Sequence, residues 1–192
     1  NIPESGNGIP DILDEVKYEL DWMFKMQESN GGVYHKVTCK NFPGSVFPEE
    51  ETDRLEIFPI SSASTADFAA VMAMAARSYK EIDAAYADKC LAAAEKAMAY
   101  LEANPGMGGF KNPSDVVTGE YPDENLTDEY FWAAAELYRT TSADSYAAAL
   151  NSVDTSKLAL GLGWEGVGYY GVNTVLSTPH ADATLKNKMQ GI

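Results

Sequence analysis

The stretch that decides the fold is Thr65-Ala-Asp-Phe-Ala-Ala-Val-Met-Ala-Met-Ala-Ala-Arg-Ser-Tyr79. Ala and Met occupy nearly every side of this segment when it is wound at about 3.6 residues per turn. A helix that is apolar all round is buried, because no face of it gains from contact with water. The segment therefore predicts a buried helix over 65–79, surrounded by other elements.

Helical patterns lie on both sides of this segment. Apolar residues from Ile9 to Phe24 recur at helical spacing, which predicts a helix over 10–28 that Asn30-Gly31-Gly32 ends. Further helices are predicted over 83–101, 127–138, 143–151, 164–177 and 180–190. Only 33–38 has the pattern of a strand, and 39–63 and 104–126 are long loops rich in Pro, Gly or Asp. The chain is therefore predicted to be all-α, with loops at one end that build a binding face.

Composition limits the partners of the chain. It has 192 residues, of which 45% are apolar, and its net charge is -15. This suits one domain or part of a larger one, and it argues against nucleic acid because phosphate would be repelled. High acidity suits calcium binding and an extracellular setting. The sequence has no run of 18 apolar residues that would span a membrane, and its two cysteines predict no disulfide framework.

Four segments resemble glycoside hydrolase family 9, the cellulase-type enzymes, and they follow the order of that family with plausible gaps. They are 6–27, 32–38 with Phe42-Pro-Gly44 and Pro48-Glu-Glu-Glu51, 64–77, and Thr127-Asp-Glu-Tyr-Phe-Trp-Ala-Ala-Ala-Glu-Leu-Tyr138. The resemblance covers most of the chain, so residues 1–192 are interpreted as part of a family 9 catalytic domain. It implies an (α/α)6 barrel, of which the chain supplies about half.

The resemblance also implies hydrolysis of β-1,4-glucan with inversion at the sugar carbon. The Asp-Ala-Gly-Asp motif, which carries the catalytic base of the family, is absent from the chain, and so are the later His motif and the catalytic Glu. We therefore nominate no catalytic residue and expect the chain alone to be inactive. Half a toroid exposes apolar helix faces, so we expect the chain to pair with the remainder of the domain or with another copy of itself.

An acidic loop over 118–129 is the candidate metal site. Ca²⁺ takes six to eight oxygen ligands from carboxylates and carbonyls. By resemblance to the family, and with Glu165 standing in beside Gly166 where the family has an Asp, the candidate ligands are Glu124, Asn125, Asp128, Glu129 and Glu165. The alternative is a plain helix start, with Thr127 as the N-cap and the two following acids favoured by the helix dipole.

Four residues are candidates for contact with a sugar chain. Aromatic rings stack on the apolar faces of glucose units, which nominates Tyr121 first and then Trp164 and Tyr169. His35 lies in the segment that resembles a wall of the family's substrate cleft, where an imidazole binds hydroxyl groups. The alternative for His35 is a packed or exposed strand histidine. Trp22 and Trp132 lie within helical patterns and are predicted to be core residues.

Two other functions remain open at this point. The chain is interpreted as part of a secreted β-1,4-glucan hydrolase, with calcium as the expected ion and no organic cofactor. The alternatives are a non-catalytic helical module that binds carbohydrate or protein, and a calcium-stabilised structural domain. Complementary catalytic residues outside the chain would favour the hydrolase over the two alternatives.

Overall fold

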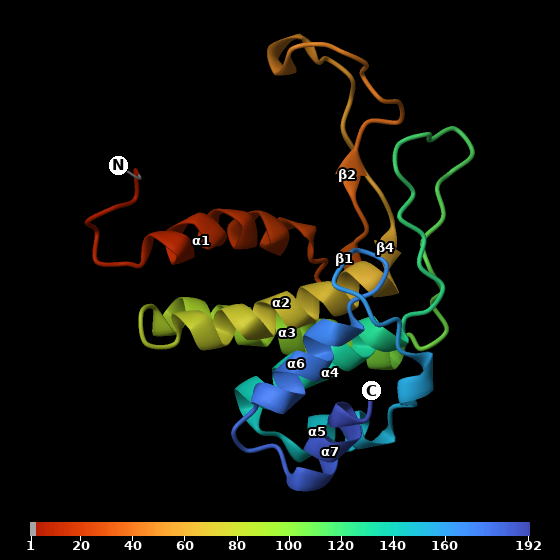
Figure 1. The fold of residues 1–192 in the computed structure, drawn as a ribbon. Helices are drawn as coiled ribbons and strands as arrows, with labels where there is room; N and C mark the ends of the chain where they lie inside the picture. The colour runs from red at the N-terminus through yellow and green to blue at the C-terminus, as the bar shows by residue number, and fades with distance from the viewer. Residues whose placement is uncertain (1–2) are drawn as a thin grey trace.

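The computed structural model describes residues 3–192, and within this range the chain is built mainly from helices (Figure 1). The all-α prediction is confirmed. The described α-helices are α1 (Asp11–Met23), α2 (Ser62–Tyr79), α3 (Ala84–Ala103), α4 (Thr127–Thr141), α5 (Asp144–Ser152), α6 (Gly168–Ser177) and α7 (Ala183–Gln190). None of them is long and apolar enough to cross a lipid bilayer, a finding that applies to the described residues.

Short strands and 3-10 turns complete the fold. The strand predicted over 33–38 is divided into β1 (Val33–Tyr34) and β2 (Val37–Thr38), which pair antiparallel with β4 (Ile60–Ser61) and β3 (Glu56–Ile57) respectively. The 3-10 turns are η1 (Phe24–Met26), η2 (Pro48–Glu50) and η3 (Thr155–Lys157). The segment between β2 and β3 projects from the helical body as an arm, at the top of Figure 1.

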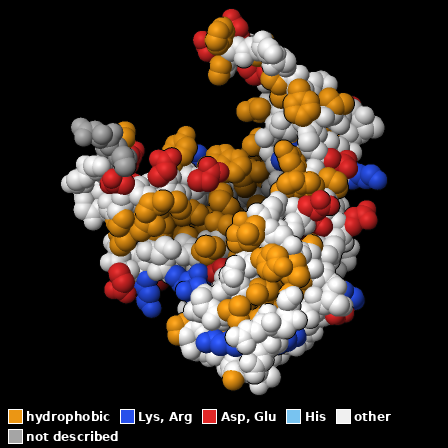
Figure 2. All heavy atoms as spheres, in the orientation of Figure 1, with side chains coloured by type: hydrophobic (Ala, Val, Ile, Leu, Met, Phe, Trp, Pro, Cys, Tyr) orange, Lys and Arg blue, Asp and Glu red, His pale blue; other side chains and the backbone are white. Residues whose placement is uncertain are grey.

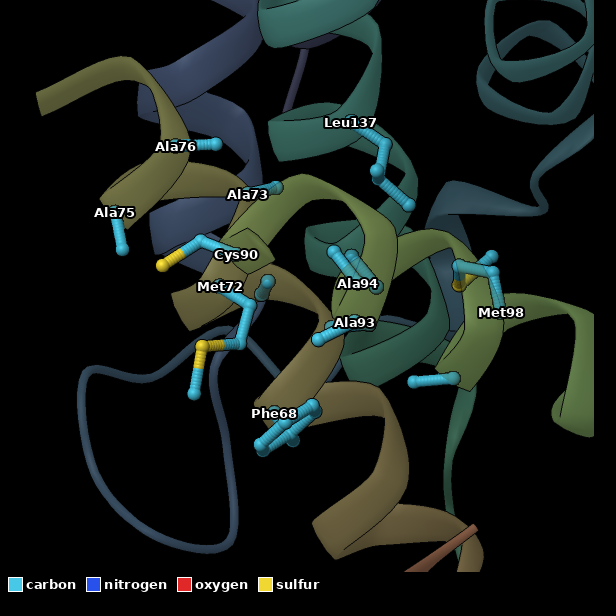
Figure 3. Packing of buried hydrophobic residues seen from close by; sticks show 14 of the residues in the cluster. Phe68, Met72, Ala73, Ala75, Ala76, Cys90, Ala93, Ala94, Met98 and Leu137 are labelled. Atoms are coloured by element: carbon cyan, nitrogen blue, oxygen red, sulfur yellow. The ribbon is translucent and has the colours of Figure 1, made fainter. Parts of the chain in front are cut away.

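Helix α2 lies at the centre of the helical body, as its apolar sequence predicted. It begins three residues earlier than expected, because the Ser61 side chain caps it by accepting a hydrogen bond from the Ser64 amide at 3.2 Å. Its alanines leave room for α3 and α4 to approach closely, and Figure 3 shows Met72 and Ala73 among buried side chains of both neighbours. Removal of this apolar surface from water is the main source of stability here.

A second core cluster joins α4 to α5, α6 and α7. Gly171 of α6 makes this possible, since a Cβ atom at that position would lie 2.5 Å from the Phe131 ring of α4. A polar contact reinforces the same junction. The buried Glu136 carboxylate of α4 pairs with Arg77 of α2 at 2.5 Å and accepts a hydrogen bond from Thr174 of α6.

Helix α1 leaves much of its apolar surface uncovered. Trp22 is 41% exposed, so the prediction that it is a core residue is wrong for this chain. Met74 of α2 is 41% exposed as well. Trp132, predicted as core, is buried. Figure 2 shows hydrophobic side chains gathered over this part of the molecule and at the end of the arm. The other large exposed apolar residues of α1 are Ile12, Val16 and Tyr18.

Candidate functional site

Two loops meet beside the N-terminal ends of α4 and α6, and each supplies an exposed aromatic ring. Tyr121 comes from the loop that precedes α4, and Trp164 comes from the loop that precedes α6. Their ring centroids are 5.6 Å apart at an interplanar angle of 82°, an edge-to-face contact. Tyr121 is 55% exposed and Trp164 is 56% exposed, so the two rings form an open pair. The structure therefore brings together two of the four predicted sugar contacts.

The backbone around Tyr121 is specialised for this placement. Tyr121 has a φ angle of 51°, in the left-handed region that side-chain-bearing residues rarely adopt. A Cβ atom at Gly119 would lie 2.7 Å from the Tyr121 ring, so a side chain there would displace the ring from its observed position. A strained tyrosine that remains exposed is a feature typical of functional sites rather than of packing.

His35 fastens the loop that carries Tyr121 to the strands. Its Nδ1 atom lies 2.9 Å from the Ser61 hydroxyl, and its Nε2 atom lies 3.0 Å from the backbone carbonyl of Glu120. Its ring stacks on Phe110 with centroids 4.0 Å apart. Burial lowers the pKa of His35, which favours the neutral imidazole. With both nitrogens engaged within the protein, contact with sugar hydroxyls stays a prediction, and the observed geometry is that of an anchor.

Lys36 is a second anchor, which sequence reasoning missed. Its ammonium group donates to the carbonyl of Gly119 at 2.5 Å and to the side chain of Asn112 at 2.7 Å. The same group lies 4.8 Å from the centre of the Phe58 ring. The adjacent His-Lys pair therefore positions the two residues that precede Tyr121. Only the position of Lys36 beside His35 could have signalled this role.

An open hollow of about 670 Å³ lies between the two loops. Glu124, Asn125 and Glu165, three of the five predicted metal ligands, line it and are exposed to solvent. The Asn125 side chain donates to the carbonyl of Lys157 at 2.8 Å, which ties the first loop to the second. Tyr169, the fourth predicted sugar contact, stands on the first turn of α6 with 41% exposure and outside the aromatic pair.

The other two predicted ligands, Asp128 and Glu129, are buried at the start of α4. The N-cap of α4 is Leu126, which makes no side-chain cap, so the alternative prediction of Thr127 as N-cap is wrong. Asp128 instead accepts a hydrogen bond from the backbone amide of Val167 in the second loop, at 2.8 Å. It thereby links α4 to the loop that carries Trp164.

A third buried carboxyl group, on Asp123, joins them. Four carboxyl oxygens here are buried without a hydrogen-bond partner, namely Asp123 Oδ2, Asp128 Oδ1 and both Glu129 oxygens. Burial, with contributions from Asp123 and Asp128, raises the pKa of Glu129 to about 10, so its carboxyl group is neutral at pH 7. Burial also raises the pKa of Asp128. Asp123 was missed by sequence reasoning, although it lies in the same acidic loop.

The chemistry of these oxygens fits a hard cation. Unpartnered buried carboxyl oxygens are costly, and a divalent ion with oxygen ligands would satisfy them. Within residues 3–192, no three His, Cys, Asp or Glu side chains are already arranged to hold a metal ion.

Comparisons with known proteins place this chain in a family. The family model of glycosyl hydrolase family 9 matches residues 2–190. The chain belongs to glycosyl hydrolase family 9. Endoglucanase D of Acetivibrio thermocellus is 41% identical over 180 residues, which are 91% of this chain and 29% of that protein. The family accounts for the fold, since the chain is part of its (α/α)6 barrel.

Solved structures of the family agree with this placement. A metagenome-derived family 9 endoglucanase superposes with a TM-score of 0.90 at 36% identity, covering 98% of this chain and 35% of that one. A structure described as AaCel9A in complex with cellobiose-like isofagomine has a TM-score of 0.89 at 38% identity, covering 97% of this chain and 36% of that one. The chain thus spans about a third of the length of these family 9 proteins.

Proposed function

We propose that this chain forms part of the substrate-binding side of a secreted family 9 enzyme that hydrolyses β-1,4-glucan with inversion. The observation that supports this most directly is the open Tyr121–Trp164 pair beside the hollow between the two loops. Exposed aromatic rings bind the apolar faces of glucose units, and the carboxylates and amide on the rim accept hydrogen bonds from sugar hydroxyls. The family membership and the cellobiose-like ligand of a related structure support the same substrate class.

In this proposal the chain binds and orients the glucan, and the bond is broken by residues outside it. Inversion needs a carboxylic acid that protonates the leaving oxygen and a carboxylate about 6.5–9.5 Å away that activates water. The chain has no family motif for either group. The uncovered apolar surface of α1, which includes Trp22 and Tyr18, is where we propose that the remainder of the domain packs.

We also propose that the acidic site takes Ca²⁺, with Asp128 and Glu129 as ligands. The support is their complete burial together with three oxygens that have no partner. Binding of an ion would give these unpartnered carboxyl oxygens a ligand, which would stabilise the start of α4. Through the Asp128 bond to the Val167 amide, it would also stabilise the loop that precedes α6.

Isothermal titration of the chain with cellohexaose tests the binding role. We expect measurable affinity that falls about tenfold on Trp164→Ala or Tyr121→Ala, because each change removes one stacking surface. Tyr18→Ala is the matched control, since Tyr18 is an exposed tyrosine on α1. An affinity that is equal in all four proteins would refute the role of the aromatic pair.

A further inference from the structure

Asn112 closes the loop that leads into Tyr121. Its side-chain nitrogen donates to the carbonyl of Thr118 at 2.7 Å, and its backbone amide donates to the Glu120 carboxylate at 2.8 Å. Its side-chain oxygen accepts from the ammonium group of Lys36 at 2.7 Å. One residue therefore binds the loop at two points just before Tyr121 and joins it to an anchor in a distant part of the chain.

We propose that Asn112 is a positioning residue for glucan binding, which holds Tyr121 in the conformation that presents its ring to the sugar. This inference rests on the proposed glucan-binding function and adds to it a residue that acts without touching the ligand. Its whole effect on affinity passes through Tyr121.

The conformation of Tyr121 is the reason that such support is needed. Its φ angle of 51° lies in the left-handed region, which is unfavourable for a residue with a side chain. A strained residue of this kind persists only where its surroundings over-determine it. Because the Tyr121 ring is 55% exposed, packing of the ring supplies little of that support. The hydrogen bonds of the preceding backbone are therefore its main constraint.

The chemistry at position 112 requires an amide. The side chain donates to a carbonyl group and accepts from an ammonium group at the same time, which only an uncharged amide does here. An aspartate would keep the acceptor for Lys36, but it would present a second oxygen to the Thr118 carbonyl and add a charge beside Glu120. Pro113 restricts the backbone of Asn112 to extended conformations, so little freedom is lost when the three bonds form.

The two rings of the aromatic pair are held independently. None of the three bonds of Asn112 reaches the loop that carries Trp164. That loop is held by the bond from the Val167 amide to Asp128. Loss of the Asn112 side chain should therefore release Tyr121 and leave Trp164 in place.

The size of the effect follows from the population of the binding conformation. The apparent affinity of a ligand falls in proportion to the fraction of protein that is competent to bind it. We expect the loop to hold Tyr121 in place about one fifth of the time without the Asn112 side chain, which weakens binding about fivefold. Removal of the ring by Tyr121→Ala sets the upper limit, because a displaced ring loses no more than an absent one.

Calorimetric titration of the chain with cellohexaose tests the proposal. Asn112→Ala and the nearly isosteric Asn112→Asp should each weaken binding about fivefold. Asn104→Ala is the matched control, because Asn104 is also half-buried and its side chain donates to the Tyr100 carbonyl at 2.8 Å, at the end of α3. This control should bind cellohexaose like wild type.

A double-mutant cycle shows whether Asn112 acts through Tyr121. In the Tyr121→Ala background, Asn112→Ala should cause no further loss of affinity, because no ring is left to position. Near-ultraviolet circular dichroism without sugar reads the ring pair independently, since Tyr121 contacts Trp164. Asn112→Ala should change the Trp164 signal, which Trp164→Phe identifies, and should leave it unchanged in the Tyr121→Ala background.

The proposal is overturned if Asn112→Asp binds cellohexaose as tightly as wild type, or if Asn112→Ala causes the same loss with and without the Tyr121 ring. The aspartate variant decides the matter even if Asn112→Ala fails to fold. If cellohexaose binds to none of the proteins, the glucan-binding function is wrong and dichroism decides the positioning role by itself. A Trp164 signal that changes only when Tyr121 is present then supports that role, and an unchanged signal overturns it.

Discussion

Replacing Glu129 by glutamine should stabilise the chain in the absence of calcium. The carboxyl group of Glu129 is fully buried and its pKa is raised from 4.5 to about 10. In the folded chain it is protonated at pH 7, whereas in the unfolded chain it is ionised. Glutamine has nearly the same shape as the protonated acid but does not gain charge on unfolding.

The magnitude follows from proton linkage. A carboxyl group whose folded pKa is raised binds its proton more tightly in the folded state, so stability falls as the pH rises from about 4.5 to about 10. At pH 7 the unfolded chain gains about 3 kcal/mol from ionisation of Glu129, at about 1.4 kcal/mol for each pH unit above 4.5. At pH 5 the same gain is under about 1 kcal/mol.

Urea and thermal unfolding in EDTA at pH 5 and pH 7 measure this difference. We expect Glu129→Gln to exceed wild type by up to about 3 kcal/mol at pH 7, or about 6 to 12 °C in Tm for a chain of this size, and to match it closely at pH 5. Glu124→Gln, an exposed position in the preceding loop, is the control and should change little at either pH.

Calcium should reverse the order of the two proteins. An ion that binds wild type and not the variant stabilises wild type by mass action. The reasoning is refuted if Glu129→Gln is destabilised by the same amount at pH 5 and pH 7, since the carboxyl group would then have a structural role that does not depend on its proton. A wild-type stability that rises between these pH values in EDTA relative to the variant would refute it as well.

Three other changes test the framework around the site. Glu136→Ala should lower the free energy of unfolding in urea by about 3–5 kcal/mol, because it leaves the half-buried Arg77 charge without its partner. The double variant Glu136→Ala with Arg77→Met should recover part of that loss. Gly171→Ala should lower the free energy of unfolding by about 1–3 kcal/mol, since its Cβ atom would collide with the Phe131 ring 2.5 Å away. If the variant unfolds like wild type, the close packing of α6 on α4 is contradicted. His35→Ala should leave the unfolding midpoint within a few degrees but weaken cellohexaose binding severalfold, because the Tyr121 loop loses its anchor; unchanged affinity would show that the loop is held without His35.

Several features of the protein could be predicted from the sequence alone. The apolar residues on nearly every side of 65–79 predicted the buried central helix. Helical spacing predicted the other helices in the right order, because this spacing depends on local geometry. The predicted ends of the helices were less accurate than their order. Helix α6 starts at Gly168 and not at 164, since the residues before it form a glycine-containing loop that Asp128 holds through the Val167 amide. That contact is invisible to a local pattern.

The candidate site shows the same division between local and distant information. Tyr121 and Trp164 were nominated one at a time from residue type, and Asp128 and Glu129 from the resemblance of the acidic loop to family 9. The tertiary structure decided that the two rings meet, that His35 serves as an anchor, and that Asp123 rather than the acids on the rim lies with the buried carboxyl groups. Burial and pairing arise between segments far apart in the chain, so residue type and spacing determine which groups are present, and only the packing of those segments determines which of them lose water and which meet.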